Sequence, residues 1–199
     1  MVRPVPAFDW IGHHADLSPN AVALIDDGRE LTLTYAQLED QSRRLAAWMA
    51  AKGVEPGDRV AFLAGNTTDT FEALFACAKL TAILVPLNWR LAVPELEFIV
   101  NDCRPRVLIF EDQFAAAANE LEVDVKLQLG PDYAAAKAAA RPGTVGKVRA
   151  SHDDAWAILY TSGTTGHPKG AICTHGMFFW NAINIGHAVG LTSKSTNLN

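Results

Sequence analysis

Residue types suited to binding phosphate are concentrated between Thr161 and Gly170, where the chain holds four hydroxyl side chains, three glycines and one lysine. Phosphate oxygens are bound by backbone N–H groups that come close where residues lack a Cβ, by hydroxyl donors, and by a cation that offsets negative charge. The segment supplies all three kinds of group and predicts a polyphosphate-binding loop. The candidate binding residues are Thr161, Ser162, Gly163, Thr164, Thr165, Gly166 and Lys169.

The spacing within this segment differs from that of the Walker A loop of P-loop nucleotide hydrolases. Gly163, Gly166 and Lys169 follow one another in steps of three, and no Gly-Lys-Ser/Thr follows a glycine at the Walker A spacing. Apolar runs on either side, at 155–160 and 171–173, predict that the segment joins two short buried strands. Composition alone leaves open an ordinary flexible turn, which such clusters usually form.

The full string from Tyr160 to Gly170 resembles the signature loop of the adenylate-forming superfamily, which includes acyl-CoA synthetases, peptide-synthetase adenylation domains and beetle luciferases. It matches every fixed position of the pattern Tyr-Thr-Ser-Gly-Thr-Thr-Gly-x-Pro-Lys-Gly, with His167 at the variable one. The part of the chain before this loop holds further landmarks that resemble the acyl-CoA synthetase branch, in the expected order. They are Thr34-Tyr35 with Leu38, 57–61, Asn66, 75–79, 85–88, and 95–96 to 102–103. The chain is therefore identified as similar to the N-terminal portion of an acyl-CoA synthetase, in the AMP-dependent synthetase/ligase family.

The resemblance implies ATP-dependent activation of a carboxylic acid, fatty or aryl, to an acyl-adenylate, followed by transfer to coenzyme A. The loop residues named above would hold the β- and γ-phosphates, and Lys169 would stabilise the leaving pyrophosphate. Mg²⁺ would share the charge, but the residues that bind Mg²⁺ and coenzyme A are expected outside this chain, and no metal ligand is predicted within it. Two alternatives stay open: an adenylation domain that loads a carrier-protein thiol, and a non-catalytic nucleotide-binding fragment.

Complete members of the family are far longer, so residues 1–199 are expected to form a truncated first part of the large domain, without the small C-terminal domain. A sheet cut short leaves an unpaired edge and exposed apolar surface. We therefore expect the 199-residue chain alone to be marginally stable, aggregation-prone and inactive in acyl-CoA synthesis.

Composition is typical of a globular enzyme, with 49% hydrophobic and 20% charged residues and a formal net charge of −5. This charge offers no general attraction to nucleic acid. The three cysteines, Cys77, Cys103 and Cys173, are far apart in apolar segments and predict reduced core thiols in a cytoplasmic protein. The apolar run 71–87 holds Glu72 and Lys79 and predicts a buried helix entering a core strand, without a membrane span. Scattered histidines form no metal pattern, and the oligomeric state is left open.

Strand and helix signals alternate, which predicts an α/β fold with a mixed, largely parallel sheet covered by helices. A helix should begin after Thr34, which forms a capping box with Gln37, and end at Gly53. Its charged residues 39, 40, 43 and 44 are expected to face solvent, and the Ala-rich segment 134–140 to form a surface helix. Other strands are expected at 60–63, 82–85, 107–110 and 123–129, and other helices at 69–80, at 94–100 and from His175.

Overall fold

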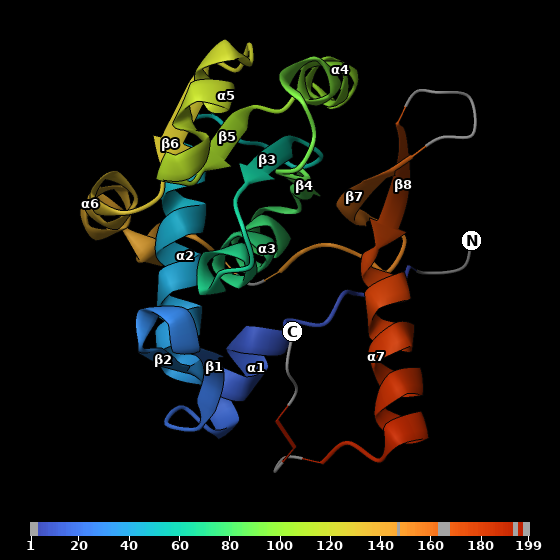
Figure 1. The fold of residues 1–199 in the computed structure, drawn as a ribbon. Helices are drawn as coiled ribbons and strands as arrows, with labels where there is room; N and C mark the ends of the chain where they lie inside the picture. Colours follow the sequence, from blue (N-terminus) through green and yellow to red (C-terminus); the bar gives the residue numbers. More distant parts are fainter. Residues whose placement is uncertain (1–3, 147, 163–167, 193–194, 197–199) are drawn as a thin grey trace.

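The computed structural model describes residues 4–146, 148–162, 168–192 and 195–196. Its main sheet has the strand order β6-β5-β3-β4-β7-β8 (Figure 1). All neighbouring pairs are parallel except the last, in which β8 runs antiparallel to β7. The strands are β3 (Arg59–Leu63), β4 (Ile83–Pro86), β5 (Val107–Phe110), β6 (Val125–Gln128), β7 (Ala155–Thr161) and β8 (Lys169–Thr174). The predicted mixed, largely parallel sheet is confirmed.

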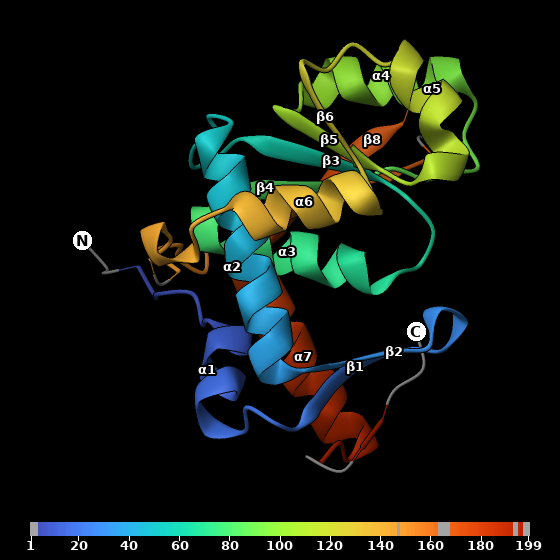
Figure 2. The ribbon, with the colours of Figure 1, turned by 90° about the vertical axis from the view of Figure 1, so that its left-hand side faces the viewer.

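Helices cover both faces of this sheet (Figure 2). The helices of the described residues are α1 (Trp10–Leu17), α2 (Tyr35–Ala51), α3 (Thr68–Leu80), α4 (Val93–Cys103), α5 (Ala115–Glu120), α6 (Pro131–Ala139) and α7 (His175–Val189). Those that cover the sheet are α2 to α6. The path from β3 to β4 runs one way across the sheet, and the path through β5 to β6 runs the other way. Because parallel crossovers are right-handed, this reversal places α4 and α5 on the face opposite α3.

Each face of the sheet packs into its own apolar cluster. On one face α2, α3 and α6 bury residues such as Leu45 and Met49 against Val60 and Phe62 of β3. On the other face α4 and α5 pack against alternate positions of the same strands, including Leu63. Both faces of β3 and β5 are thus sealed, as a parallel sheet requires.

The N-terminal region forms a separate small hairpin, β1 (Val22–Asp26) paired antiparallel with β2 (Leu31–Thr34). The predicted capping box is confirmed, since Gln37 N–H donates to Thr34 Oγ1 and Thr34 N–H donates to Gln37 Oε1. Helix α2 ends as expected, with Gly53 in the left-handed region at φ 81°. Three short 3₁₀ turns lie at Asp27–Arg29, Asp112–Phe114 and Pro142–Thr144.

The Ala-rich helix α6 is more than the surface helix predicted from its composition. Its Lys137 and Tyr133 are buried, and both donate to the Glu72 carboxylate of α3, at 2.6 and 2.9 Å. Burial raises the pKa of Glu72, and the charge and hydrogen bond of Lys137 oppose that rise. Most of its alanines are exposed, as predicted, while Tyr133 and Lys137 face inward and link α6 to α3 through Glu72.

The charged face of α2 is also only partly solvated, contrary to the prediction. Arg43 donates to the carbonyls of Pro142 and Val145, at 3.2 and 2.7 Å, and so holds the segment before β7. Glu39 pairs at 2.7 Å with Lys79, whose side chain is only 2% exposed. Asp40 and Arg44 form the helical i, i+4 pair expected of an exposed face.

Helix α7 and strand β8 expose much apolar surface. Met177, Trp180 and Ile172 are each more than half exposed, and α7 is exposed over most of its length beyond its first turn. A helix that is apolar on several sides is normally covered by other structure. Among the described residues no helix is both long and apolar enough to span a membrane.

We predict that removing the Lys137 charge destabilises the fold strongly, because Glu72 would be left buried without its ion-pair partner. Lys137→Met should lower the free energy of unfolding by about 3 kcal/mol, measured by urea titration. Lys52→Met, at an exposed position, is the control and should change it little. The double variant Glu72→Gln with Lys137→Met should recover much of the loss. A single variant as stable as the parent would contradict a structural role for this ion pair.

Candidate functional site

The predicted phosphate loop connects the two strands of the β7–β8 hairpin. Thr161, the last residue of β7, pairs in register with Lys169, the first residue of β8. Strand β8 therefore begins two residues earlier than the sequence predicted, because Lys169 and Gly170 continue the antiparallel ladder. Gly163, Thr164, Thr165 and Gly166 lie outside the described residues, together with His167.

The candidate phosphate-binding residues that the structure describes lie at the exposed end of this hairpin. Thr161, Ser162 and Lys169 are all exposed, and the Lys169 ammonium has no ion pair within the described part of the chain. The structure thus brings a cation and hydroxyl donors together across one hairpin. Such a group can contact an anionic ligand without first breaking an internal ion pair.

The two strands flanking the loop are less buried than predicted. Strand β7 is buried only near its start, at Trp156 and Ala157, and β8 is exposed from Lys169 to Ile172. The reason is that β8 is the edge strand, with β7 as its sole partner among the described strands. Cys173 of β8 is correspondingly half-buried, whereas Cys77 and Cys103 are core thiols as expected. Burial raises the pKa of Cys103 to about 11, which keeps it protonated.

Gly170 permits a close contact at the base of the loop. It pairs with Tyr160 across the hairpin, and a Cβ at this position would lie 2.8 Å from Ile158 Cγ2 and 3.2 Å from Tyr160 Cζ. The Tyr160 and Ile158 side chains therefore occupy the space over the glycine. The sequence identifies Gly170 as one of the three loop glycines, but this packing depends on strand register, which the local sequence does not indicate.

A hollow of about 320 Å³ lies beside the hairpin base, lined by Arg59, Asp102, Cys103, Ile158, Tyr160, Gly170 and Ile172. Across it the Tyr160 hydroxyl donates to the Asp102 carboxylate, at the C-terminal end of α4. Both residues lie in segments that resemble the family, but nothing in their spacing of 58 positions signals the contact.

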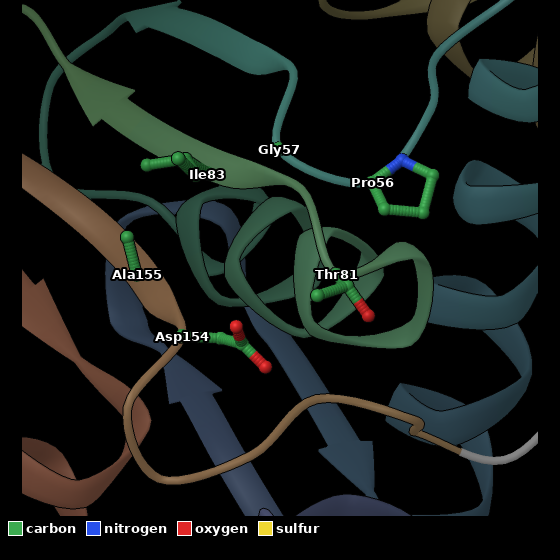
Figure 3. A pocket seen from close by; sticks show the side chains of 6 residues that line it. All are labelled: Pro56, Gly57, Thr81, Ile83, Asp154 and Ala155. Atoms are coloured by element: carbon green, nitrogen blue, oxygen red, sulfur yellow. The ribbon is translucent and has the colours of Figure 1, made fainter.

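A second hollow, of about 260 Å³, lies at the amino ends of the parallel strands, away from the loop end of β7 (Figure 3). Its lining residues are Pro56, Gly57, Thr81, Ile83, Asp154 and Ala155. Asp154 is the only ionisable group among them, and its carboxylate already accepts from the backbone N–H and hydroxyl of Ser151. We assign this hollow no chemistry.

His175 anchors the far end of the hairpin, where β8 continues into α7. Its ring stacks on Trp156 with centroids 4.7 Å apart and planes 6° apart, and its backbone N–H donates to the Asp154 carbonyl. The ring is buried, and its Nε2 has no hydrogen-bond partner among the residues that the structure describes. Burial lowers the pKa of His175 to about 4, with nearby His152 acting in the same direction. The imidazole is therefore neutral near pH 7.

The described residues contain no group of three or more His, Cys, Asp or Glu side chains placed to hold a metal ion. Mg²⁺ is therefore not assigned to any residue here, and the location of its ligands stays a prediction.

Comparison with known proteins gives a consistent result. A family model described as "AMP-binding enzyme" matches residues 11–197. The fatty acid–[acyl-carrier-protein] ligase ScoC of Streptomyces coeruleorubidus is 40% identical, over 83% of this chain and 32% of its own length. The feruloyl-CoA synthase of an Amycolatopsis species is 39% identical, over 88% of this chain and 35% of its own length. The chain thus spans about a third of the length of these curated relatives.

A solved structure of similar fold is the inhibitor-bound N-terminal domain of FACL13 from Mycobacterium tuberculosis. It aligns with a TM-score of 0.79 and 32% identity, covering 86% of this chain and 45% of that domain. The α/β architecture with a mostly parallel sheet is therefore shared with an adenylate-forming enzyme domain.

We predict that Gly170→Ala destabilises the hairpin, because the added methyl would force Ile158 and the Tyr160 ring to move. Overpacking of this kind costs about 1–3 kcal/mol. The melting temperature should fall by several degrees, measured by circular dichroism. Gly143→Ala, where a Cβ would meet nothing within 4 Å, is the control. Equal melting temperatures for both variants would contradict the close contact.

We also predict that His175 makes stability depend on pH. Between about pH 6.5 and 4 the unfolded chain binds a proton at His175 that the folded chain does not, so stability falls as pH falls through this range. The loss should be about 3 kcal/mol, because each unit of pKa difference between the folded and unfolded chain corresponds to about 1.4 kcal/mol. Urea titrations of the parent and His175→Phe should show the smaller pH dependence in the variant. Identical pH dependence in both would exclude His175 as the titrating group.

Proposed function

The chain belongs to the AMP-binding enzyme family, and on that premise we propose that it carries the pyrophosphate-handling hairpin of an enzyme that activates a carboxylic acid with ATP. The observation that carries this proposal is the register of Thr161 with Lys169, which sets beside hydroxyl donors a cation that forms no ion pair with the described residues. On this proposal residues 1–199 form the N-terminal part of the large domain of a longer, cytoplasmic enzyme.

The chemistry explains why such a hairpin is needed. A carboxylate is a poor electrophile near neutral pH and becomes reactive when ATP supplies a good leaving group. Attack of the carboxylate on the α-phosphate forms the acyl-adenylate and releases pyrophosphate, so negative charge builds on the departing phosphates. Lys169 would offset that charge, and Thr161 and Ser162 would donate hydrogen bonds to the phosphate oxygens. The glycines from 163 to 166 would bring backbone N–H groups to the same oxygens.

Lys169 suits this role because of where it stands. Its ammonium is exposed and has no carboxylate partner in the described part of the chain, so binding a phosphate costs no internal ion pair. Its backbone is held in the ladder with Thr161, which limits how far the charge can move from the hydroxyl donors. Mg²⁺, when bound with ATP, would supply further charge neutralisation, with ligands outside the described residues.

The acceptor thiol has two candidates. Coenzyme A is favoured by the resemblance to acyl-CoA synthetases and by the similarity to a feruloyl-CoA synthase. A carrier-protein thiol is favoured by the similarity to ScoC, which is named as an acyl-carrier-protein ligase. The acid is proposed to be a fatty or aryl carboxylic acid. Comparing coenzyme A with a phosphopantetheinylated carrier protein as acceptor decides between the two thiols.

The proposal is tested by exchange of radiolabelled pyrophosphate into ATP, which reports adenylate formation without any thiol. A suitable protein is a chimaera in which residues 1–199 replace the matching part of the Amycolatopsis feruloyl-CoA synthase, with ferulate as the acid. We expect this chimaera to exchange pyrophosphate into ATP above the background of a control reaction. A folded chimaera that does not exchange would favour the non-catalytic alternative.

We predict that Lys169→Ala in this chimaera slows pyrophosphate exchange by about 100-fold, because removing one positioned charge donor has effects of this size. Thioester formation from preformed feruloyl-adenylate should be nearly unchanged, since no pyrophosphate leaves in that step. Lys126→Ala is the control. Lys126 lies on β6, at the edge of the sheet opposite β8, and its ammonium donates to the Asn119 carbonyl. Equal slowing of both half-reactions would show that Lys169 is structural.

A further inference from the structure

We propose that Asp102 is a positioning residue, which holds Tyr160 through a hydrogen bond and thereby fixes where Thr161 and Lys169 stand at the end of the hairpin. The inference rests on the proposed function of that hairpin. It concerns α4, an element with no residue in the predicted phosphate site, and so extends the site beyond the signature segment.

The hairpin is joined to the parallel sheet only near its start. Strand β7 pairs with β4 at a single register position, Leu84 with Ala157, whereas β3 pairs with β4 at four. Beyond Ala157, β8 is the sole strand that pairs with β7 in the described part of the chain. The ladder between β7 and β8 holds the two strands to each other but does not hold the pair against the rest of the molecule. Other contacts must do so.

Those contacts lie on the face of β7 that points toward α4. Ile158 and Tyr160 alternate onto that face and pack against the apolar cluster that α4 and α5 form with the sheet. Tyr160 reaches furthest, and its hydroxyl donates to Asp102 at the last turn of α4. Burial raises the pKa of Tyr160, and the hydrogen bond to Asp102 raises it further, so the phenol keeps the proton that it donates. Since Thr161 is the next residue, the position of Tyr160 determines the position of the loop end.

Packing alone leaves the hairpin room to move here. The hollow of about 320 Å³ lies between the base of the hairpin and the C-terminal end of α4, and both Tyr160 and Gly170 line it. The hydrogen bond across the hollow supplies a fixed distance that apolar contacts do not. A tyrosine is long enough to make this link while its ring covers the glycine.

The C-terminal end of α4, which carries Asp102, is itself fixed by hydrogen bonds from Arg59. The Arg59 guanidinium donates to the carbonyls of Cys103, Arg104 and Gly57, at 2.5, 3.0 and 3.1 Å. It therefore caps the C-terminal end of α4 and ties it to the start of β3. Asp102 lies in the turn of α4 that Arg59 caps, and its carboxylate accepts from the Tyr160 hydroxyl. The chain of contacts runs from the central strand through Arg59 and α4 to the hairpin.

A second tyrosine–carboxylate bond provides a matched control. Tyr133 of α6 donates to Glu72 of α3 at 2.9 Å, and this bond is buried and lies on the opposite face of the sheet. Tyr133→Phe and Tyr160→Phe remove the same chemical group and keep the ring. A purely structural role for either bond predicts lower stability only.

The test compares Tyr160→Phe, Asp102→Ala, Asp102→Asn and Tyr133→Phe in the chimaera. We expect Tyr160→Phe and Asp102→Ala each to raise the KM for ATP in pyrophosphate exchange about 5–10-fold, the coupling expected of one positioning bond. Asp102→Asn keeps an acceptor oxygen and should restore most of the parental KM. Tyr133→Phe should lower the melting temperature at least as much but leave the KM unchanged. An unchanged KM in Asp102→Ala, or an equal rise in Tyr133→Phe, overturns the proposal.

A second measurement, on the 199-residue chain without nucleotide, separates this inference from the proposed function. Hydrogen exchange of the backbone amides at 169–172 should be faster in Tyr160→Phe and Asp102→Ala than in the parent and in Tyr133→Phe. If the parental chimaera showed no pyrophosphate exchange, the proposed function would fail while the amide measurement still decided whether Asp102 anchors the hairpin. Unchanged amide exchange in both variants contradicts the anchor whatever the activity.

Discussion

The parallel strands β3, β4 and β5 need apolar cover on both faces, and most of the molecule serves that need. A parallel sheet is built from crossovers of fixed hand, so it receives helices on both faces only if the chain reverses its direction across the sheet. The strand order β5-β3-β4 contains that reversal. It creates two apolar clusters, one with α2, α3 and α6 and one with α4 and α5, and these make the centre of the sheet the rigid frame for everything attached to it.

Charged groups inside this frame act as links between helices. Helix α3 buries Glu72 and Lys79. Glu72 pairs with Lys137 of α6, and Lys79 pairs with Glu39 of α2 and with Asp9, the residue that caps the start of α1. A buried charge left without a partner is costly, so these pairs restrict the positions in which the helices can pack. Trp156 extends the same frame to the hairpin, because its Nε1 donates to the Leu74 carbonyl of α3 while its ring stacks on His175. The start of β7 is therefore fixed by two helices.

The candidate site combines this fixed start with an exposed end. Binding of a polyphosphate needs accessible N–H groups, hydroxyls and a cation, which a fully buried strand pair would not provide. The hairpin meets the need by leaving the sheet after Ala157, so that Thr161 and Lys169 are exposed while their backbones stay paired.

Much of this could be predicted from the sequence, because it depends on local patterns. Periodicity located the main strands and helices, Thr34 with Gln37 marked the start of α2, and the string from Tyr160 to Gly170 indicated the family to which the chain belongs. Only the tertiary structure decided which polar residues would be buried in pairs, that β8 would be an exposed edge, and that Tyr160 would meet Asp102. Side chains 58 or more positions apart meet through strand order and helix packing, and no local pattern encodes those two properties.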